Sequence, residues 1–377
     1  MKNLYDVIII GGGPIGSYTA LRLSKNGFKV CVFDQKNEIG DGVICTGVIS
    51  TESFKRFNLP VDSILTKIQS FTFISPENQR LEYIATKPFA YVVDRELFDR
   101  KLSEIARRDG VEFNLGINVK GIEEDRKYYK INYDGISRLS KFVIIATGVK
   151  YNLQKKIGLG IPPQFFYGSQ IELSRNVEPS NIEIYLSQKY IPGSFAWVVP
   201  VNGNRARIGM ILEKNGNIFL KRFLKHRLNI ADNILKQNRI DMKPIVYGPI
   251  KKSVFEKILV VGEAAGQVKT TTGGGIFTGL LCAEIAVDYL KRALMYGKPL
   301  EEYDITWRSA LSSEIEIGKK IRRVASKIND RTIERLFTFV KHNRFWVDLL
   351  LPKINFDFHS DLFYFCLKSF SHLLKIP

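Results

Sequence analysis

A glycine-rich turn near the start of the chain carries backbone suited to binding a diphosphate. Residues 11–16 read GGGPIG, follow an apolar run over 5–10, and open an amphipathic stretch over 14–26. This order of strand, turn and helix is typical of a dinucleotide-binding fingerprint, in which glycines let the backbone approach a pyrophosphate. Unpaired N–H groups at the helix N-terminus favour the negative charge. The turn therefore predicts a dinucleotide site.

An acidic residue stands at the spacing that such a site uses for the ribose. The next predicted strand covers 29–33 and ends at Asp34. A carboxylate there accepts hydrogen bonds from the adenosine ribose hydroxyls and repels a 2′-phosphate. Position and residue type thus strengthen the dinucleotide interpretation.

A second glycine-rich turn lies far downstream, at residues 272–276 (TGGGI). It follows a buried strand that begins at residue 258 and ends in GEAAG, so Glu263 stands where the chain leaves the sheet and is our candidate for the ribityl chain of a flavin. The glycines begin an apolar helix predicted over 276–294, whose N-terminus would stabilise the N1 and C2 carbonyl region of a reduced flavin. Alternatively, the glycines only permit close helix packing.

Two further segments belong to the same nucleotide-binding pattern. Arg95 heads a helical stretch that reaches Arg108, and it is either a partner for cofactor phosphate or an ordinary helix-surface arginine. Residues 142–145 form a buried strand that ends in a small-residue turn at Gly148, as expected where a chain passes beneath a nucleotide.

Three motifs give the chain a family resemblance over about residues 1–300. They are CTGVIS at 45–50, GEAAG at 262–266 with GGGI at 273–276, and PGSFAWVVP at 192–200. With these motifs the chain resembles the geranylgeranyl reductase family, within the flavoproteins that include para-hydroxybenzoate hydroxylase. It departs from the family pattern at Phe195 and Val199, where tyrosine and phenylalanine are usual, at Glu263, an aspartate in most members, and at Thr270, often a proline.

The resemblance implies an α/β (α+β) fold with FAD as cofactor. The expected architecture is a Rossmann-like FAD-binding domain, an inserted mixed β-sheet substrate domain and a C-terminal helical region. The residues expected to contact FAD are Gly11, Gly13, Ile15, Gly16, Asp34, Cys45, Thr46, Gly47, Arg95, Val119, Gly148, Glu263, Gly274, Gly275 and Ile276. The residues expected to line the substrate pocket are Phe195, Trp197, Val199 and Pro200.

The resemblance also implies an activity, the reduction of isolated carbon–carbon double bonds in polyprenyl chains of membrane lipids, as in archaeal ether lipids. An unactivated alkene has no carbonyl to accept electron density, so hydride addition needs a proton donor and a water-poor pocket. The family position of Cys45 suggests it as that donor, although free cysteines often act only as small buried hydrophobes. Trp197 is either a stacking group for developing positive charge or a pocket wall.

The chain divides into three predicted parts. The FAD-binding domain comprises 1–66, 91–158 and 245–299, and the substrate domain comprises 67–90 and 159–244. Six short strands are expected to form one sheet in the substrate domain, over 67–75, 80–86, 169–174, 181–187, 195–201 and 205–212.

The third part, 300–377, is expected to be a helical cap in which aromatic and basic side chains alternate. Such a segment either lies in a bilayer interface or packs as an ordinary amphipathic helix. The aromatic residues are Phe337, Phe339, Phe345, Trp346, Phe356, Phe358, Phe363, Tyr364, Phe365 and Phe370, and the basic ones include Lys341, Arg344 and Lys368. Polyprenyl substrates favour membrane contact, and we expect a cytoplasmic protein held peripherally at the inner face of the cell membrane.

Composition limits the remaining possibilities. A net charge of +18 would attract anionic headgroups or an acidic electron donor such as ferredoxin, whereas no motif accompanies it that would indicate nucleic acid. NAD(P)H is the other candidate donor. Four cysteines without a C-x-x-C pair and four histidines argue against a metal site. An FAD monooxygenase, a quinone reductase acting on the side chain or ring, and a non-catalytic prenyl-binding protein stay open as alternatives.

Overall fold

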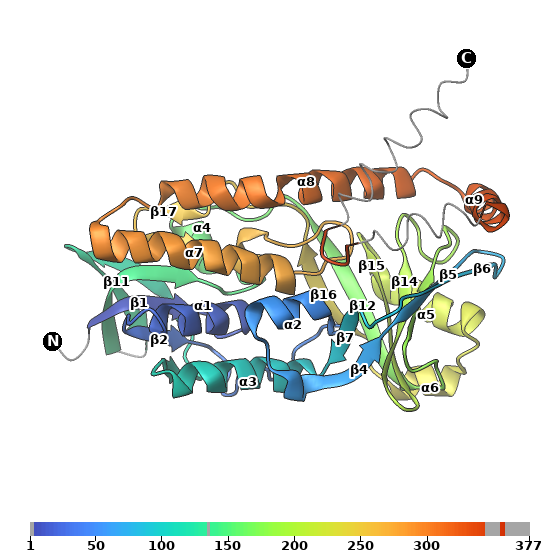
Figure 1. Ribbon diagram of the computed structural model, residues 1–377, viewed down its shortest axis with the longest axis horizontal. Coiled ribbons are helices and arrows are strands. Elements are labelled where there is room, and N and C mark those ends of the chain that lie inside the picture. The colour runs from blue at the N-terminus through green and yellow to red at the C-terminus, as the bar shows by residue number, and fades with distance from the viewer. Residues whose placement is uncertain (1–3, 134–135, 344–354, 359–377) are drawn as a thin grey trace, which may run out of the picture.

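The computed structural model describes residues 4–133, 136–343 and 355–358. Two large sheets follow one another along the long axis of the molecule, and long helices run beside the first of them (Figure 1). This arrangement confirms the predicted class, a nucleotide-binding α/β unit joined to a mixed sheet and followed by helices.

Within the described residues, the first sheet has eight strands with a parallel centre. Its main order is β17-β18-β11-β1-β2-β8, and β9 and β10 add to β11 as an antiparallel extension. Its strands are β1 (Leu4–Ile10), β2 (Val30–Phe33), β8 (Glu112–Asn114), β9 (Gly121–Asp125), β10 (Tyr128–Tyr133), β11 (Ile136–Ile145), β17 (Val254–Phe255) and β18 (Ile258–Val260). β1 pairs in parallel with both β11 and β2, so their carboxyl ends reach one edge, where α/β sheets bind ligands.

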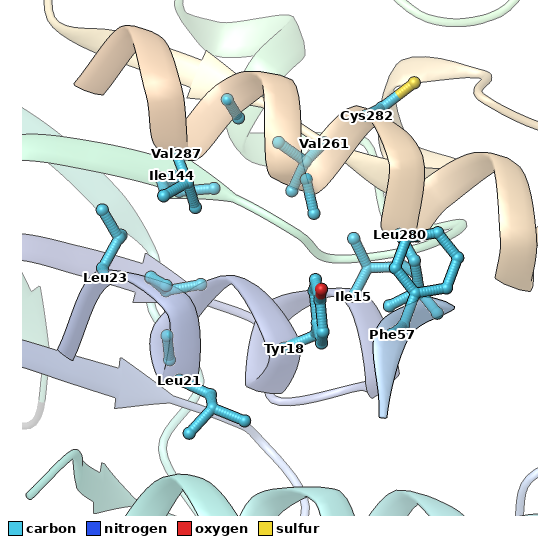
Figure 2. Packing of buried hydrophobic residues seen from close by; sticks show 14 of the residues in the cluster. Ile15, Tyr18, Leu21, Leu23, Phe57, Ile144, Val261, Leu280, Cys282 and Val287 are labelled. Atoms are coloured by element: carbon cyan, nitrogen blue, oxygen red, sulfur yellow. The ribbon is translucent and has the colours of Figure 1, made fainter. Parts of the chain in front are cut away.

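Helices bury one face of this sheet. They are α1 (Pro14–Ser24), α3 (Arg95–Arg108), α7 (Ile276–Tyr296) and α8 (Glu301–Ala325), and α2 (Thr51–Phe57) packs beside them. Figure 2 shows Ile15 of α1 and Leu280 of α7 gathered with Phe57 between the two helices. The opposite face packs on β9, β10 and α4 (Asn152–Lys156). Burying each large apolar side chain contributes about 1.5–3 kcal/mol, which holds the turns at the sheet edge in place.

The second sheet has seven strands in the described part of the chain, in the order β16-β12-β15-β14-β13-β5-β6. They are β5 (Ser70–Ile74), β6 (Arg80–Ile84), β12 (Phe165–Ser174), β13 (Asn181–Tyr185), β14 (Ala196–Asn202), β15 (Arg205–Leu212) and β16 (Asp241–Val246). One face packs on α5 (Gly216–Arg227), with α6 (Asp232–Gln237) following it. The other face turns toward a small sheet of β3 (Val48–Ser50), β7 (Ala90–Val93) and β4 (Ile64–Ile68).

One predicted strand is divided into two in the structure, and the large sheet contains one strand that was not predicted. The stretch expected as a single strand over 67–75 is divided at Gln69, because the Gln69 N–H donates to Ser180 O at 2.9 Å and its side-chain amide to Ala85 O at 2.9 Å. The chain leaves the small sheet there and enters the large one. β16 was not among the six predicted strands, and it forms the edge of the sheet beside β12.

The last part of the described chain is helical, as expected, in α8 and α9 (Asp330–His342). α9 packs Ile333 and Phe337 inward and leaves Leu336 and Phe339 exposed. Among the described residues, no helix is both long enough and apolar enough to cross a membrane. Several residues named for the interfacial prediction lie outside the described residues, namely Arg344, Phe345, Trp346, Phe363, Tyr364, Phe365, Lys368 and Phe370.

Candidate functional site

A cavity of about 1010 Å³ lies where the carboxyl ends of the parallel strands meet the second sheet. Both glycine-rich turns line it, together with Asp34, Cys45 and Glu263. Residues far apart in the sequence are therefore brought to one site, which is large enough for a dinucleotide-sized ligand.

In the first turn, Gly11 and Gly16 pack closely against neighbouring backbone, whereas Gly13 faces open space. Gly11 has φ of +109°, and a Cβ on Gly16 would stand 1.9 Å from Gly11 O, so only glycine fits at these two positions. A Cβ on Gly13 would meet no atom within 4 Å, because it would point into the cavity. Gly13 is also the N-cap of α1, and no side chain in the described part of the chain satisfies the first N–H groups of that helix. Free donors and open space thus coincide.

Asp34 is held in place by backbone amides. Its Oδ2 accepts a hydrogen bond from Gly12 N at 2.7 Å, and its Oδ1 accepts one from Lys36 N at 2.8 Å. The carboxylate therefore lies across the first turn, with further lone pairs for a ligand. Val119 lines the same end of the cavity and is buried.

Glu263 and the second turn define another part of the cavity. Glu263 follows β18 in a short 3-10 turn (Gly262–Ala265), and its Oε2 accepts a hydrogen bond from Lys243 Nζ on β16 at 2.8 Å. Gly148 lies beside this carboxylate, since a Cβ there would be 3.8 Å from Glu263 Oε2. Gly275 caps α7 without any side-chain partner for the helix, and Gly274 and Ile276 also line the cavity.

The segment 45–47 runs between the two sheets, and hydrogen bonds from Arg207 and with Gln170 hold it there. Arg207 Nη1 donates to Thr46 O at 2.8 Å and to Val93 O at 3.0 Å, and its Nε donates to Glu172 at 3.0 Å. Gly47 has φ of +79°, and a Cβ there would approach Val93 O to 2.6 Å. These contacts present Cys45 to the cavity as a free, half-buried thiol.

Arg95 is buried, so the alternative of an ordinary surface arginine is wrong. It makes three hydrogen bonds of 2.9–3.1 Å to Asp99, one helical turn later on α3. It also interacts with the Cys45 thiol. Burial alone would lower the pKa of Arg95, but Asp99 and Cys45 outweigh it and raise that pKa. The guanidinium therefore stays charged at the cavity wall.

The four residues expected in the substrate pocket lie on β14 or directly before it, in the second sheet. Trp197 and Val199 share the face of β14 that packs on the small sheet, and the Trp197 ring covers Gly209 so closely that a Cβ there would be 2.5 Å from the indole. Phe195 lies 6.0 Å from the Trp197 ring, centroid to centroid, and Pro200 is buried on β14. Among the described residues that line the cavity, these four do not occur.

Comparison with known proteins agrees with this geometry. A family model described as FAD dependent oxidoreductase matches residues 6–51. A digeranylgeranylglycerophospholipid reductase of Methanocaldococcus jannaschii is 28% identical over 362 residues, covering 89% of this chain and 90% of the relative. The chain is similar to digeranylgeranylglycerophospholipid reductases and to FAD-dependent oxidoreductases.

Solved structures show the same fold. A geranylgeranyl bacteriochlorophyll reductase-like protein from Thermoplasma acidophilum superposes with a TM-score of 0.81 at 20% identity, covering 90% of this chain and 91% of that one. A p-nitrophenol 4-monooxygenase from Pseudomonas putida has a TM-score of 0.74 at 17% identity, covering 90% and 93%. At these identities the likeness concerns the fold, which reductases and monooxygenases share.

The residues present fit FAD, the cofactor of this oxidoreductase type. The open side of Gly13, the unsatisfied helix N-termini at Gly13 and Gly275 and the amide-held Asp34 supply what a dinucleotide requires. FAD, when bound, would supply the redox chemistry, and the chain would hold and orient it. The residues named as FAD contacts stay predictions, because the structure shows that they line the cavity and not which atoms of FAD they touch.

Several cavity residues were missed by sequence reasoning. Asp99 had a visible signal, since an acid one turn after Arg95 indicates a helix ion pair. Lys243 had none, because only the pairing of β16 with β12 brings it to Glu263. Lys269 and Asp357 also line the cavity and were not anticipated.

Proposed function

We propose that this flavoprotein hydrogenates isolated carbon–carbon double bonds in geranylgeranyl or polyprenyl chains of membrane lipids. The observation that carries the proposal is that both glycine-rich turns, Cys45 and the edge of the mixed sheet line the same cavity. The named relatives act on digeranylgeranylglycerophospholipid, and their similarity over about nine-tenths of the chain supports the same substrate class.

The reaction requires hydride on one alkene carbon and a proton on the other. FAD, once reduced, supplies the hydride. The chain supplies an apolar wall beside the cavity, formed by Trp197, Val199 and Phe89 among others, that suits a hydrocarbon chain. Cys45 lines the cavity with its thiol and is the proton-donor candidate suggested by family position. We propose Phe195 and Pro200 as further residues of the substrate pocket.

We propose that each predicted domain has its own role. Residues 1–66, 91–158 and 245–299 bind FAD, residues 67–90 and 159–244 form the substrate side, and residues 300–377 provide membrane contact. On α9, exposed Leu336 and Phe339 stand among Arg335 and Lys341, a combination that favours the interface of an anionic bilayer. This supports peripheral attachment to the inner face of the cell membrane.

The electron donor is proposed as ferredoxin or NAD(P)H. A groove of about 570 Å³ beside α5 and α6 carries a positive charge that would attract an acidic donor. Its basic residues are Lys221, Arg222, Lys225, His226, Lys236 and Arg239.

An anaerobic assay with excess chemical reductant tests the proposal. The purified protein is chemically reduced, a geranylgeranyl lipid and a menaquinone are added in separate reactions, and the products are analysed by mass spectrometry. Mass gains in steps of two hydrogens in the prenyl chain support the proposal and identify the accepted headgroup. Flavin reoxidation by menaquinone without chain saturation would favour a quinone-ring reductase. A product that gains an oxygen atom only after air is admitted would replace the proposal with a monooxygenase, and no turnover with FAD bound would favour a binding protein.

A further inference from the structure

A short segment of the C-terminal part closes one side of the cavity. Lys269 Nζ, just before the second glycine turn, donates a hydrogen bond to Phe356 O at 2.8 Å and lies 5.1 Å from the Phe356 ring centroid. Phe356 packs on Phe89 at 5.9 Å and Phe358 packs on Phe277 at 5.5 Å, between ring centroids. The segment is therefore anchored to both the flavin-binding unit and the apolar wall.

This segment brings Asp357 into the cavity. Asp357 is 4% exposed and lines the cavity together with Lys269 and Ser50. The Asn355 side chain accepts hydrogen bonds from Asp357 N at 2.8 Å and Phe358 N at 3.2 Å, so the turn that carries the carboxyl has a defined shape. Phe356 also belongs to the apolar cluster that contains Trp197. Asp357 thus stands where the flavin cavity borders the proposed prenyl wall.

The other acids at the cavity are committed to close contacts. Asp34 accepts two backbone N–H groups, Asp99 is paired with Arg95, and Glu263 lies 2.8 Å from Lys243. Asp357 has its cation, Lys269, at the longer distance of 3.8 Å. Among the described acids that line the cavity and have a cation partner, Asp357 is therefore the one whose cation is most distant.

We propose that the Asp357 carboxyl is the proton source for alkene reduction, with Lys269 as the residue that positions it. This inference rests on the proposed function. The O–H bond of Asp357 breaks as its proton bonds to one alkene carbon through the π electron pair, and the other carbon takes hydride from reduced FAD. The alkene gains two hydrogens, FAD returns to its oxidised form, and the Asp357 carboxylate regains a proton from solvent.

The electrostatic surroundings of Asp357 favour a bound proton. Burial raises the pKa of Asp357, and nearby Glu52 acts in the same direction, whereas Lys269 and the Ser50 hydroxyl oppose it. Burial also lowers the pKa of Lys269, against the attraction of Asp357 and Glu314. Because burial raises the pKa of Asp357 and lowers that of Lys269, this pair becomes neutral, with Asp357 protonated, more readily than an exposed ion pair would. Because a donor must be protonated, the rate should fall as pH rises through the pKa of Asp357.

The test uses full-length protein with FAD bound and compares Asp357→Asn, Asp357→Glu and Cys45→Ala with wild type. Asp125→Asn, an exposed acid at the end of β9 that lines neither the cavity nor the basic groove, is the matched control. We expect Asp357→Asn to keep its FAD and its reoxidation by oxygen, to slow chain saturation by 100-fold or more, and to lose the fall in rate at high pH. Asp357→Glu should recover part of the rate and the pH dependence. Infrared difference spectra should lose one protonated-carboxyl C=O band in Asp357→Asn, independently of turnover.

Each outcome decides between the alternatives. Chain saturation by Asp357→Asn at the wild-type rate and with the wild-type pH profile would overturn the role of Asp357. A slow variant that keeps both the pH profile and the infrared band would also overturn it, since the loss would then be structural. If only Cys45→Ala abolishes the pH dependence, the proton comes from the thiol. Wild-type protein that saturates no prenyl chain overturns the proposed function itself and this inference with it.

Discussion

Substituting Gly13 by valine should separate the folding of this protein from its affinity for FAD. A Cβ at Gly13 meets no atom within 4 Å, and the backbone there, with φ of −62° and ψ of −178°, is extended and open to any L-residue. The added methyl groups therefore enter the cavity above the N-terminus of α1, where the pyrophosphate is expected. The folded protein loses no contact, whereas the added methyl groups occupy space that the FAD pyrophosphate needs.

The size of the effect follows from the contacts at stake. Replacing glycine where the backbone is compatible stabilises a protein by about 0.4–1 kcal/mol, so the apoprotein should unfold at the wild-type temperature or slightly above. A hydrogen bond to a charged group contributes about 1.5–3 kcal/mol, and losing one to a phosphate oxygen weakens FAD binding by about 10- to 150-fold. Titration of stripped protein with FAD, followed by fluorescence, measures the change in Kd, and calorimetry measures the melting temperature.

Gly16→Ala is the matched variant with the opposite expectation. Its Cβ would stand 1.9 Å from Gly11 O, so turn and helix must move apart, at a cost of about 1–3 kcal/mol or more in the free energy of unfolding. Its melting temperature should fall even without FAD. An unchanged FAD Kd in Gly13→Val would refute the assignment of this turn as the phosphate site. An unchanged melting temperature in Gly16→Ala would refute the close packing of Gly16 on Gly11.

Three further predictions concern other parts of the chain. Glu263→Ala should weaken FAD binding by about tenfold or more and leave Lys243 without its partner, whereas the exposed control Glu213→Ala should bind normally in the same titration. Cys45→Ala should keep FAD and slow chain saturation less than Asp357→Asn does; a wild-type rate would eliminate the thiol as obligatory donor. Although burial opposes it, hydrogen bonds from Arg308 and Ser253 lower the pKa of Asp304, so its contribution to stability is present at neutral pH and is lost as pH falls below about 4. The urea concentration at the unfolding midpoint should therefore fall less steeply at acid pH in Asp304→Asn than in wild type. The same fall in both proteins would contradict this account.

Local patterns in the chain were sufficient to predict the strand, turn and helix of the nucleotide-binding unit. The apolar run before GGGPIG, the helical spacing after it and the acid at Asp34 each describe a few consecutive residues, and together they specify a strand, a turn and a helix. The same reasoning extends to α7 behind its glycines. Such features are readable from sequence because glycine, helix spacing and strand length act through the local backbone.

Contacts between distant segments were decided only by the tertiary structure. The partner of Glu263 depends on β16 pairing with β12, and the cavity obtains Asp357 because a C-terminal turn packs on Lys269. The break at Gln69 likewise depends on Ser180, which the linear pattern does not reveal. The sequence by itself determined the cofactor class and the elements that hold it, because these rest on backbone conformation. Which ionisable side chains share the cavity depends on sheet order and on burial, and these exist only once the chain has folded.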